Sequence, residues 1–251
     1  MLKRILKQSL HRISPRGAAW VADQVWAFRL AREARALRRS CDRAPDLGAV
    51  ADQVLRSRWF GAIQKKSEIL PLLIALQRSR PRRLCEIGAA QGGTLALFSQ
   101  VAATDARLLS IDLNFAPARI RSHRHLVRPR QRVTCLRADS HSPATVETVK
   151  RWLGDQALDF LFIDGDHTLA GVATDHRLYA PLVRAGGLVA FHDIVPDFKT
   201  RHGIVTPADV GEVPAFWQDL KRRSAGTREL IEEPGQDGFG IGVVGWPEEP
   251  A

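Results

Sequence analysis

The sequence predicts an α/β protein in which helices cover both faces of an open, doubly wound parallel sheet. Apolar strands alternate with helical segments between Arg83 and His192, as expected for parallel strands joined by crossover helices. The runs LLSI, FLFI and LVAF are continuously apolar, which is typical of strands buried on both faces. With 251 residues, 45% of them hydrophobic, the chain is long enough for one such domain with an extension.

The expected elements follow in chain order. A helix over residues 18–39, a turn at 44–48 and a helix over 63–77, which Pro71 kinks or splits, precede the sheet. Strands that we expect to be parallel cover residues 83–87, 108–112, 132–137, 158–164 and 188–192. Helices between and after them are predicted at 94–102, 116–126, 143–153, 170–182 and 214–222. The last two strands, 228–232 and 239–244, leave no room for a crossover helix and should form an antiparallel hairpin.

The positive charge is concentrated at the N-terminus. Residues 1–40 hold ten Lys or Arg and two Asp or Glu, a net charge of +8, whereas the whole chain carries +10. We therefore predict a basic helical extension over 1–60 and the α/β domain over 61–251. The extension could dock on an anionic membrane surface or an acidic partner. Alternatively, it is a solvated helix that packs its apolar side chains onto the domain, namely Trp20, Val21, Val25, Trp26 and Phe28. Nucleic-acid binding is not expected, because the basic residues accompany no recognisable reader motif.

Cysteine usage and hydropathy indicate a cytoplasmic protein. Cys41, Cys85 and Cys135 are odd in number, widely spaced and without a CxxC pair, which suits a reducing compartment and does not suggest zinc. No run of eighteen apolar residues and no secretory signal is found.

A glycine-rich turn follows the first strand and opens a helix. Glycines there let the backbone approach a ligand and direct free N–H groups at it. The pattern is Gly-x-x-x-Gly-Gly from Gly88 to Gly93, with Ala90 in place of a glycine, which disfavours a nicotinamide dinucleotide. Asp112 and Asp139 end the next two strands. The first could accept both hydroxyls of a ribose and the second could reach a purine edge, or each could cap a helix.

A second set of polar residues follows two further strands. Parallel strands bring their carboxyl ends to one edge, where open α/β sheets bind ligands. Asp164, Asp166 and His167 come from one strand end, and His192 and Asp193 come from the next. Carboxylates are ligands for hard cations, so Asp164 and Asp193 are a natural ligand pair. Alternatives remain for each residue: Asp166 or His167 as a capping or turn residue, His192 as a base or a hydrogen-bonded wall, and Asp164 as purely structural.

Other polar side chains have less specific expectations. His176 and Tyr179 fall within a predicted helix and are expected to pack or to lie at the surface. His202 lies in a polar loop over 197–211 that could cover an acceptor.

Together these motifs resemble the class I S-adenosylmethionine-dependent methyltransferases. Within them, the chain resembles the branch of macrocin-type sugar O-methyltransferases and cephalosporin-hydroxylase-like proteins. The resemblance covers residues 63–244 and rests on the E-x-G-x-x-x-G-G turn, Asp112, Asp139, the segment FIDGDHTLAGVATDHRLYAPLVRAGGLVAFHDI, and the tail motifs VPAFWQDLKRR and GFGIGVV. It implies a Rossmann-like seven-stranded sheet of order 3-2-1-4-5-7-6 with strand 7 antiparallel.

The resemblance also implies a cofactor and residue roles. S-adenosylmethionine would be the cofactor, with Glu86, Gly88 and Gly92 shaping its turn, Asp112 holding the ribose and Asp139 near the adenine. Gln91, Thr94 and Ser140 are further candidates.

The implied reaction is O-methylation of a hydroxyl on a sugar or a glycosylated small molecule, assisted by Mg²⁺ or a transition metal. Asp164, His192 and Asp193 would hold the cation, and Asp166 or His167 would be the base. His192 stands where the branch has an acid and suits a transition metal better than Mg²⁺.

Two other functions stay open from the sequence. One is a metal-dependent hydroxylase, and the other is a non-catalytic cofactor-binding partner of a glycan-assembly enzyme. The acceptor and a homo-oligomeric state are likewise left open.

Overall fold

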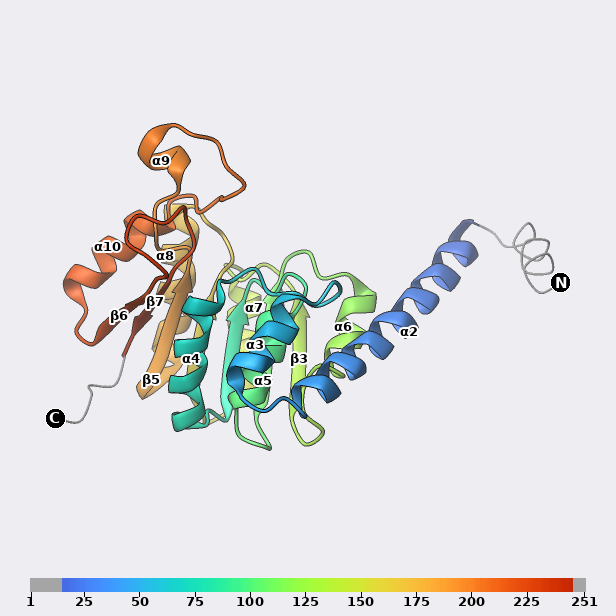
Figure 1. The fold of residues 1–251 in the computed structure, drawn as a ribbon. Coiled ribbons are helices and arrows are strands. Elements are labelled where there is room, and N and C mark those ends of the chain that lie inside the picture. The colour runs from blue at the N-terminus through green and yellow to red at the C-terminus, as the bar shows by residue number, and fades with distance from the viewer. Residues whose placement is uncertain (1–14, 246–251) are drawn as a thin grey trace.

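A seven-stranded sheet forms the centre of the structure, a computed structural model that describes residues 15–245 (Figure 1). The strand order is β3-β2-β1-β4-β5-β7-β6. The first five strands pair in parallel, and β7 is antiparallel to both β5 and β6. The strands are β1 Arg83–Ile87, β2 Arg107–Asp112, β3 Arg132–Arg137, β4 Leu158–Ile163, β5 Val183–His192, β6 Thr227–Leu230 and β7 Ile241–Val244. The predicted fold class, order and closing hairpin are confirmed.

Helices cover both faces of the sheet, and each face has its own apolar core. Side chains alternate along the buried strands, as the strand geometry requires. Leu84 and Phe160 face one core, while Cys85 and Leu161 face the other. The first core holds helices α3 Leu47–Leu55, α4 Lys66–Ser79, α5 Gly93–Val101 and α6 Pro117–His123. The second core holds α7 Pro143–Leu153, α8 Leu169–Tyr179 and α10 Val213–Arg223.

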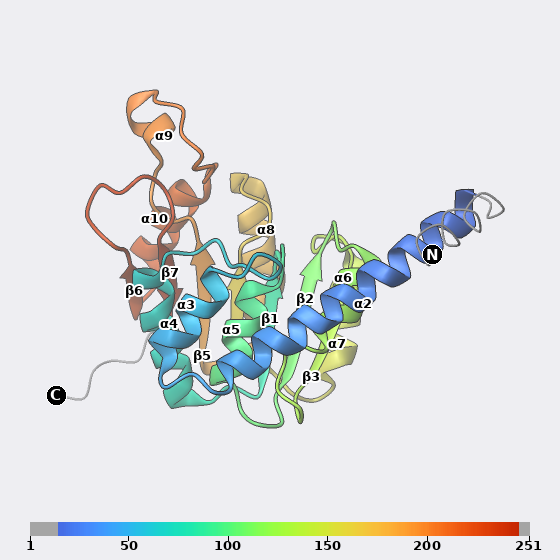
Figure 2. The same ribbon diagram turned by 45° about the vertical axis from the view of Figure 1, so that its right-hand side comes forward.

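The N-terminal helix α2, Pro15–Cys41, joins the first core from Ala27 onward. Leu30, Ala34 and Cys41 are buried there, whereas the preceding turns extend beyond the domain alongside α6 (Figure 2). Trp20, Val25 and Phe28 are 64%, 64% and 72% exposed, so the expectation that they pack onto the domain is wrong. Neighbouring residues of α2 do contact the domain, since Trp26 packs edge-on against Trp59 and Ala27 is buried.

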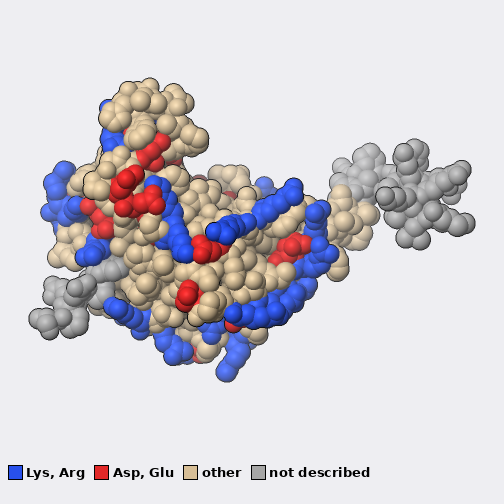
Figure 3. Space-filling model, in the orientation of Figure 1, with Lys and Arg blue, Asp and Glu red and all other residues tan. Residues whose placement is uncertain are grey.

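Positive charge gathers on the surface around α2. Lys and Arg side chains form rows across the half of the molecule that carries α2, with few acidic side chains among them (Figure 3). The contacts of α2 with α6 include an ion pair between Asp23 and Arg121. In the described part of the chain, no helix combines the length and the apolar character needed to cross a membrane.

Two short helices lack a counterpart in the sequence prediction. Helix α3 begins where a turn was expected, because Asp46 accepts a hydrogen bond from the backbone N of Ala49 (2.8 Å) and caps it. Helix α9, Phe198–His202, is capped in the same way by Asp197 and lies in the loop after β5. That loop projects from the body of the molecule (Figure 1).

The boundaries between α8 and β5 also differ from expectation. The helix ends at Tyr179, a short 3₁₀ turn (η1) covers Ala180–Leu182, and β5 begins at Val183 rather than at residue 188. A register shift interrupts its pairing with β4 between Leu158 and Phe160. Gly186 and Gly187, which lie between the helix and the strand expected from the sequence, are therefore part of an irregularity inside β5.

Leu30 tests whether α2 is part of the core. Replacing it by Ala removes buried side-chain volume, so Leu30→Ala should lower the free energy of unfolding by about 2–4 kcal/mol, measured by urea denaturation. The control Phe28→Ala, two residues away on the exposed side, should stay close to the wild-type value. Equal stabilities of the two variants would show that α2 does not depend on this packing.

Candidate active site

A cavity of about 510 Å³ lies at the carboxyl ends of β1, β2, β3 and β4. Its size lies within the usual range for small-molecule sites. Six residues expected from the sequence line it, namely Gly88, Asp112, Asp139, Ser140, Asp164 and Asp166. His141 lines it as well and was not expected.

Asp112 holds the glycine-rich turn in place. Its Oδ2 accepts hydrogen bonds from the backbone N of Ala89 (3.0 Å) and Ala90 (3.1 Å), and its Oδ1 accepts one from Asn114 N (2.7 Å). An ionised carboxylate has about four acceptor positions, so acceptor capacity is left for a ligand hydroxyl. The nearby Asp139 accepts from His141 N (2.8 Å). Both aspartates therefore shape their own turns rather than cap the following helices.

Two glycines allow the turn to approach its neighbours. Gly88 has φ of 84°, and a Cβ there would lie 1.8 Å from the carbonyl oxygen of Asp164. Gly92 has φ of 89°, and its Cβ would lie 2.6 Å from Nε2 of His123. Only a residue without a side chain fits either position. Gly88 therefore brings the cofactor-type turn against the end of β4.

Glu86 supports the turn from beneath and does not line the cavity. Its buried carboxyl accepts hydrogen bonds from Thr94 Oγ1 (2.8 Å) and Ser110 Oγ (2.6 Å), which joins β1 to α5 and β2. Burial raises the pKa of Glu86 to about 7, although both hydroxyl donors oppose the rise.

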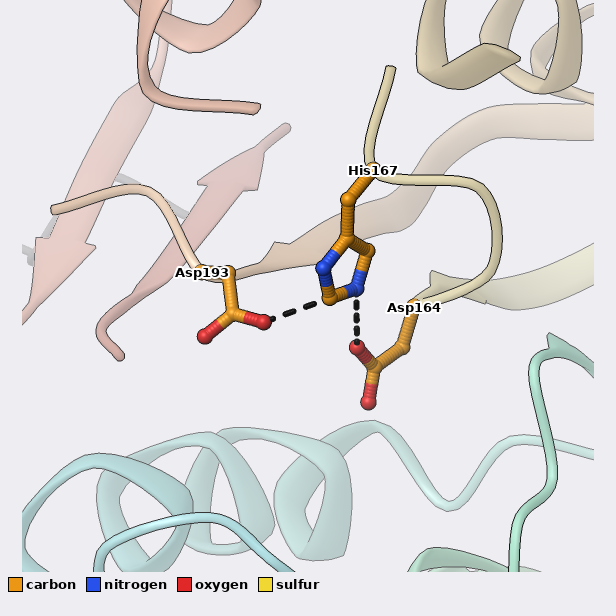
Figure 4. Close-up of side chains that lie close together, drawn as sticks. All are labelled: Asp164, His167 and Asp193. Atoms are coloured by element: carbon orange, nitrogen blue, oxygen red, sulfur yellow. Dashed lines mark ion pairs between the residues drawn. The ribbon is translucent and has the colours of Figure 1, made fainter. Parts of the chain in front are cut away.

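Three side chains converge at the neighbouring edge of the sheet (Figure 4). Asp164 follows β4, His167 lies in the turn before α8, and Asp193 follows β5. Nε2 of His167 lies 3.7 Å from Oδ1 of Asp164 and 3.5 Å from Oδ2 of Asp193. The three potential ligand atoms lie within 4.8 Å of one another, so they could surround one cation.

His192 lies against the same carboxylates from the protein interior. Its Nδ1 lies 3.3 Å from both Asp164 Oδ1 and Asp193 Oδ2, and its residue is only 4% exposed. The ring packs near Phe162 and Phe239, and its Nε2 is buried without a hydrogen-bond partner among the described residues. The sequence suggested His192 as the third ligand, whereas the geometry brings His167 into that position.

The charges of this cluster compensate one another. The neighbouring carboxylates of Asp164 and Asp193 raise the pKa of His167 to about 9, against the effect of burial. Burial disfavours a charged His192, but the two carboxylates prevail and raise its pKa to about 10. Burial alone would raise the pKa of Asp164, but the two histidines hold it well below its usual range. The carboxylates thus favour protonated rings, and the rings favour an ionised Asp164.

Two contacts orient the cluster from outside. Gln64 Nε2 donates to Asp164 Oδ2 (3.1 Å) from the loop before α4. His167 Nδ1 lies 2.8 Å from the carbonyl oxygen of Asp209, which fixes the direction of the ring. Sequence reasoning missed Gln64, because it belongs to no strand end and no motif marks it.

Asp166 lies apart from the cluster. Its Oδ1 accepts a hydrogen bond from Thr168 N (2.9 Å), and this bond lowers its pKa. Thr168 itself caps α8 by accepting from Gly171 N (3.0 Å). The structure thus unites Asp164, His167, His192 and Asp193, while Asp166 lies on the cavity wall with a turn-stabilising contact.

The backbone of Asp193 adopts a left-handed conformation with φ of 61°. Apart from asparagine and aspartate, residues that carry a side chain rarely adopt this conformation. Such backbone strain often marks functional sites. The conformation places the carboxylate beside that of Asp164 and His167.

The carboxyl of Glu86 should make stability depend on pH. Its ordinary pKa is 4.5 and its folded-state value is about 7. Between these values the folded chain keeps a proton on Glu86 that the unfolded chain has released, so the contribution of Glu86 to the free energy of unfolding should fall as pH rises from 4.5 to 7 and level off above. The fall should reach at most about 3 kcal/mol.

Urea denaturation over a pH series measures this effect. Glu86→Gln cannot ionise and should flatten the curve in that window, whereas the surface control Glu147→Gln should follow the wild type. A Glu86→Gln curve parallel to the wild-type curve would show that another group titrates.

One protein family matches the part of the chain that contains the site. Residues 85–194 match the model of a family described as a methyltransferase domain. This segment contains the glycine-rich turn, both strand-end aspartates and the whole Asp/His cluster. No curated protein matches the chain.

The comparison with solved structures gives matches at low sequence identity. An O-methyltransferase from Bacillus cereus, in complex with SAH, is 17% identical, with a TM-score of 0.51 over 82% of this chain and 90% of that chain. The O-methyltransferase TomG from Streptomyces achromogenes, in complex with SAM, is 20% identical, with a TM-score of 0.49 over 79% of this chain and 89% of that chain. The family match covers 110 of the 251 residues, and the sheet has the strand order that the resemblance to class I S-adenosylmethionine-dependent methyltransferases implies.

Proposed function

We propose that the protein transfers a methyl group from S-adenosylmethionine to a hydroxyl of a sugar or a glycosylated small molecule, with help from a divalent cation. The observation that carries this proposal is the position of Asp164. It lines the cofactor-type cavity and also belongs to the Asp/His cluster, so the two sites adjoin. The sugar class rests on the resemblance of the DGDH and HDI segments to the sugar O-methyltransferase branch.

The cavity fits the nucleoside part of the cofactor. Gly88 supplies close backbone approach, Asp112 retains acceptor capacity for ribose hydroxyls, and Asp139 lies on the purine side. When bound, S-adenosylmethionine supplies an electrophilic methyl group. The task of the chain is then to orient the acceptor and to help its hydroxyl lose a proton.

The Asp/His cluster fits a divalent cation. We assign Asp164, His167 and Asp193 as its ligands, with His192 as the buried residue that orients both carboxylates. One nitrogen and two oxygen donors favour a transition metal such as Mn²⁺ or Fe²⁺ over Mg²⁺. Such a cation supplies positive charge that lowers the pKa of an acceptor hydroxyl.

The choice of base follows from the same geometry. His167 is assigned to the cation and holds a proton when the site has none, so it is a poor base. Asp166 lines the cavity and is exposed, which leaves its second carboxylate oxygen able to accept a proton. Its lowered pKa makes it a weak base, which is adequate only if the cation has already acidified the hydroxyl.

Gly88 tests the cofactor site. Gly88→Ala would place a methyl group 1.8 Å from the carbonyl oxygen of Asp164, so we expect S-adenosylhomocysteine binding to weaken by at least about a hundredfold, a loss near 3 kcal/mol, in calorimetric titration. Gly203→Ala is the matched control, because it also has a positive φ, of 71°, but no atom within 4 Å of the added Cβ. Wild-type affinity in a folded Gly88→Ala protein would contradict the proposed site.

The cation and the reaction are tested together. Asp193→Ala should keep S-adenosylhomocysteine binding and lose Mn²⁺ binding, because it removes a ligand but does not line the cavity. The rate at which a labelled methyl group is transferred to a panel of glycosides should fall by about 100-fold or more. Losses of this size follow the removal of a group that stabilises charge in the transition state. The control Asp105→Asn removes only a surface ion pair with Arg82 and should behave as wild type.

The outcomes separate the candidate functions. Methyl transfer that is abolished by a chelator and restored by Mn²⁺ supports the proposal. Tight Fe²⁺ uptake with oxygenated products and no cofactor binding would favour a hydroxylase. Cofactor binding with no turnover on any hydroxyl acceptor would favour a non-catalytic partner.

A further inference from the structure

Helix α8 connects the two halves of the site. It begins directly after the turn that holds Asp164, Asp166 and His167, and its later turns reach the loop that follows β3. Tyr179 is fully buried and donates a hydrogen bond from its hydroxyl to the carbonyl oxygen of Ser140 (2.7 Å). One turn earlier, Asp175 Oδ1 lies 3.3 Å from His141 Nε2. Both side chains therefore fix the loop on the purine side of the cavity.

Asp175 is an unusual residue to bury in a helix. It is 0% exposed, and neither carboxylate oxygen makes a hydrogen bond of standard geometry among the described residues. Burial raises its pKa. A buried carboxylate with so few partners does not add to stability. The imidazole of His141 and the side chain of Ser140 lie beside it, so we assign it a positioning role.

His141 is the member of this pair that reaches the cavity. It lines the cavity between Ser140 and the Asp164 turn, and its side chain is 30% exposed. Nε2 is buried and faces Asp175, which leaves Nδ1 as the nitrogen available to a ligand. When an imidazole carries its single proton on Nε2, here the side of Asp175, Nδ1 is a hydrogen-bond acceptor.

We propose that His141, held by Asp175, is a specificity-determining residue for the cofactor, and that its Nδ1 accepts a hydrogen bond from the exocyclic amino group of the adenine. This inference rests on the proposed cofactor site. An acceptor at this position favours adenine over hypoxanthine, because hypoxanthine carries a carbonyl oxygen where adenine carries the amino group. Two acceptors would then face each other without a proton between them.

Calorimetric titration with two nucleosides tests this assignment. We expect the wild type to bind S-adenosylhomocysteine at least about tenfold more tightly than S-inosylhomocysteine. This is the effect expected when one hydrogen bond is lost and its acceptor is left unpaired. His141→Ala should reduce this ratio to about two or less, mainly by weakening S-adenosylhomocysteine. Asp175→Asn should reduce the ratio in part, because the amide oxygen can still accept from His141 while the carboxylate charge is gone.

Two controls separate recognition from folding. His202→Ala removes an exposed imidazole that does not line the cavity, and it should keep the wild-type ratio. Tyr179→Phe removes the hydrogen bond to Ser140 but keeps His141, so it should weaken both ligands about equally. Because the ratio compares two ligands on one protein, a general loss of stability cannot produce the expected change.

The outcomes are distinguishable from those of the proposed function. A wild-type ratio in a folded His141→Ala protein overturns the role of His141 and leaves the methyltransferase site intact. If the wild type binds neither nucleoside, the proposed cofactor site fails and this assignment fails with it. A ratio that falls in His141→Ala but not in His202→Ala supports both.

Discussion

The contact between Gly88 and the carbonyl oxygen of Asp164 determines how the two halves of the site meet. The ends of β1 and β4 are joined by a hydrogen bond from Asp164 N to Ile87 O (2.9 Å), and no side chain separates them at the next residue. The turn of β1 therefore lies directly against the aspartate that begins the Asp/His cluster. A cavity for a nucleoside and a cluster suited to a cation share one wall because a single position in the chain carries no Cβ.

The sequence predicted those parts of the fold that depend on local pattern. Continuous apolar runs mark the buried strands, and the strand ends supply all four members of the cluster. Periodicity missed α3 and α9, which are short and depend on single capping aspartates, Asp46 and Asp197. It also placed Trp20 and Phe28 against the domain, because an apolar pattern does not reveal which side of a helix the domain covers. Gln64 and Asp175 acquire their roles through contacts with distant residues, which no single sequence displays.

The cluster is electrically balanced with or without a bound cation. Two carboxylates held close together would repel each other, and two protonated histidines offset that repulsion. A cation that entered would take over the role of the protons, so its binding would release them. The same residues can thus preserve the fold and prepare the chemistry, and the glutamine and backbone contacts around them fix their directions.

The left-handed backbone of Asp193 has an implication for how the protein could change under selection. An asparagine or a glycine would adopt that conformation more readily and would also remove one of two neighbouring negative charges. Laboratory evolution for heat resistance alone should therefore favour replacement at this position, and its most robust descendants would be inactive. Among natural relatives, a neutral residue here would mark a copy that keeps the fold after losing its chemistry.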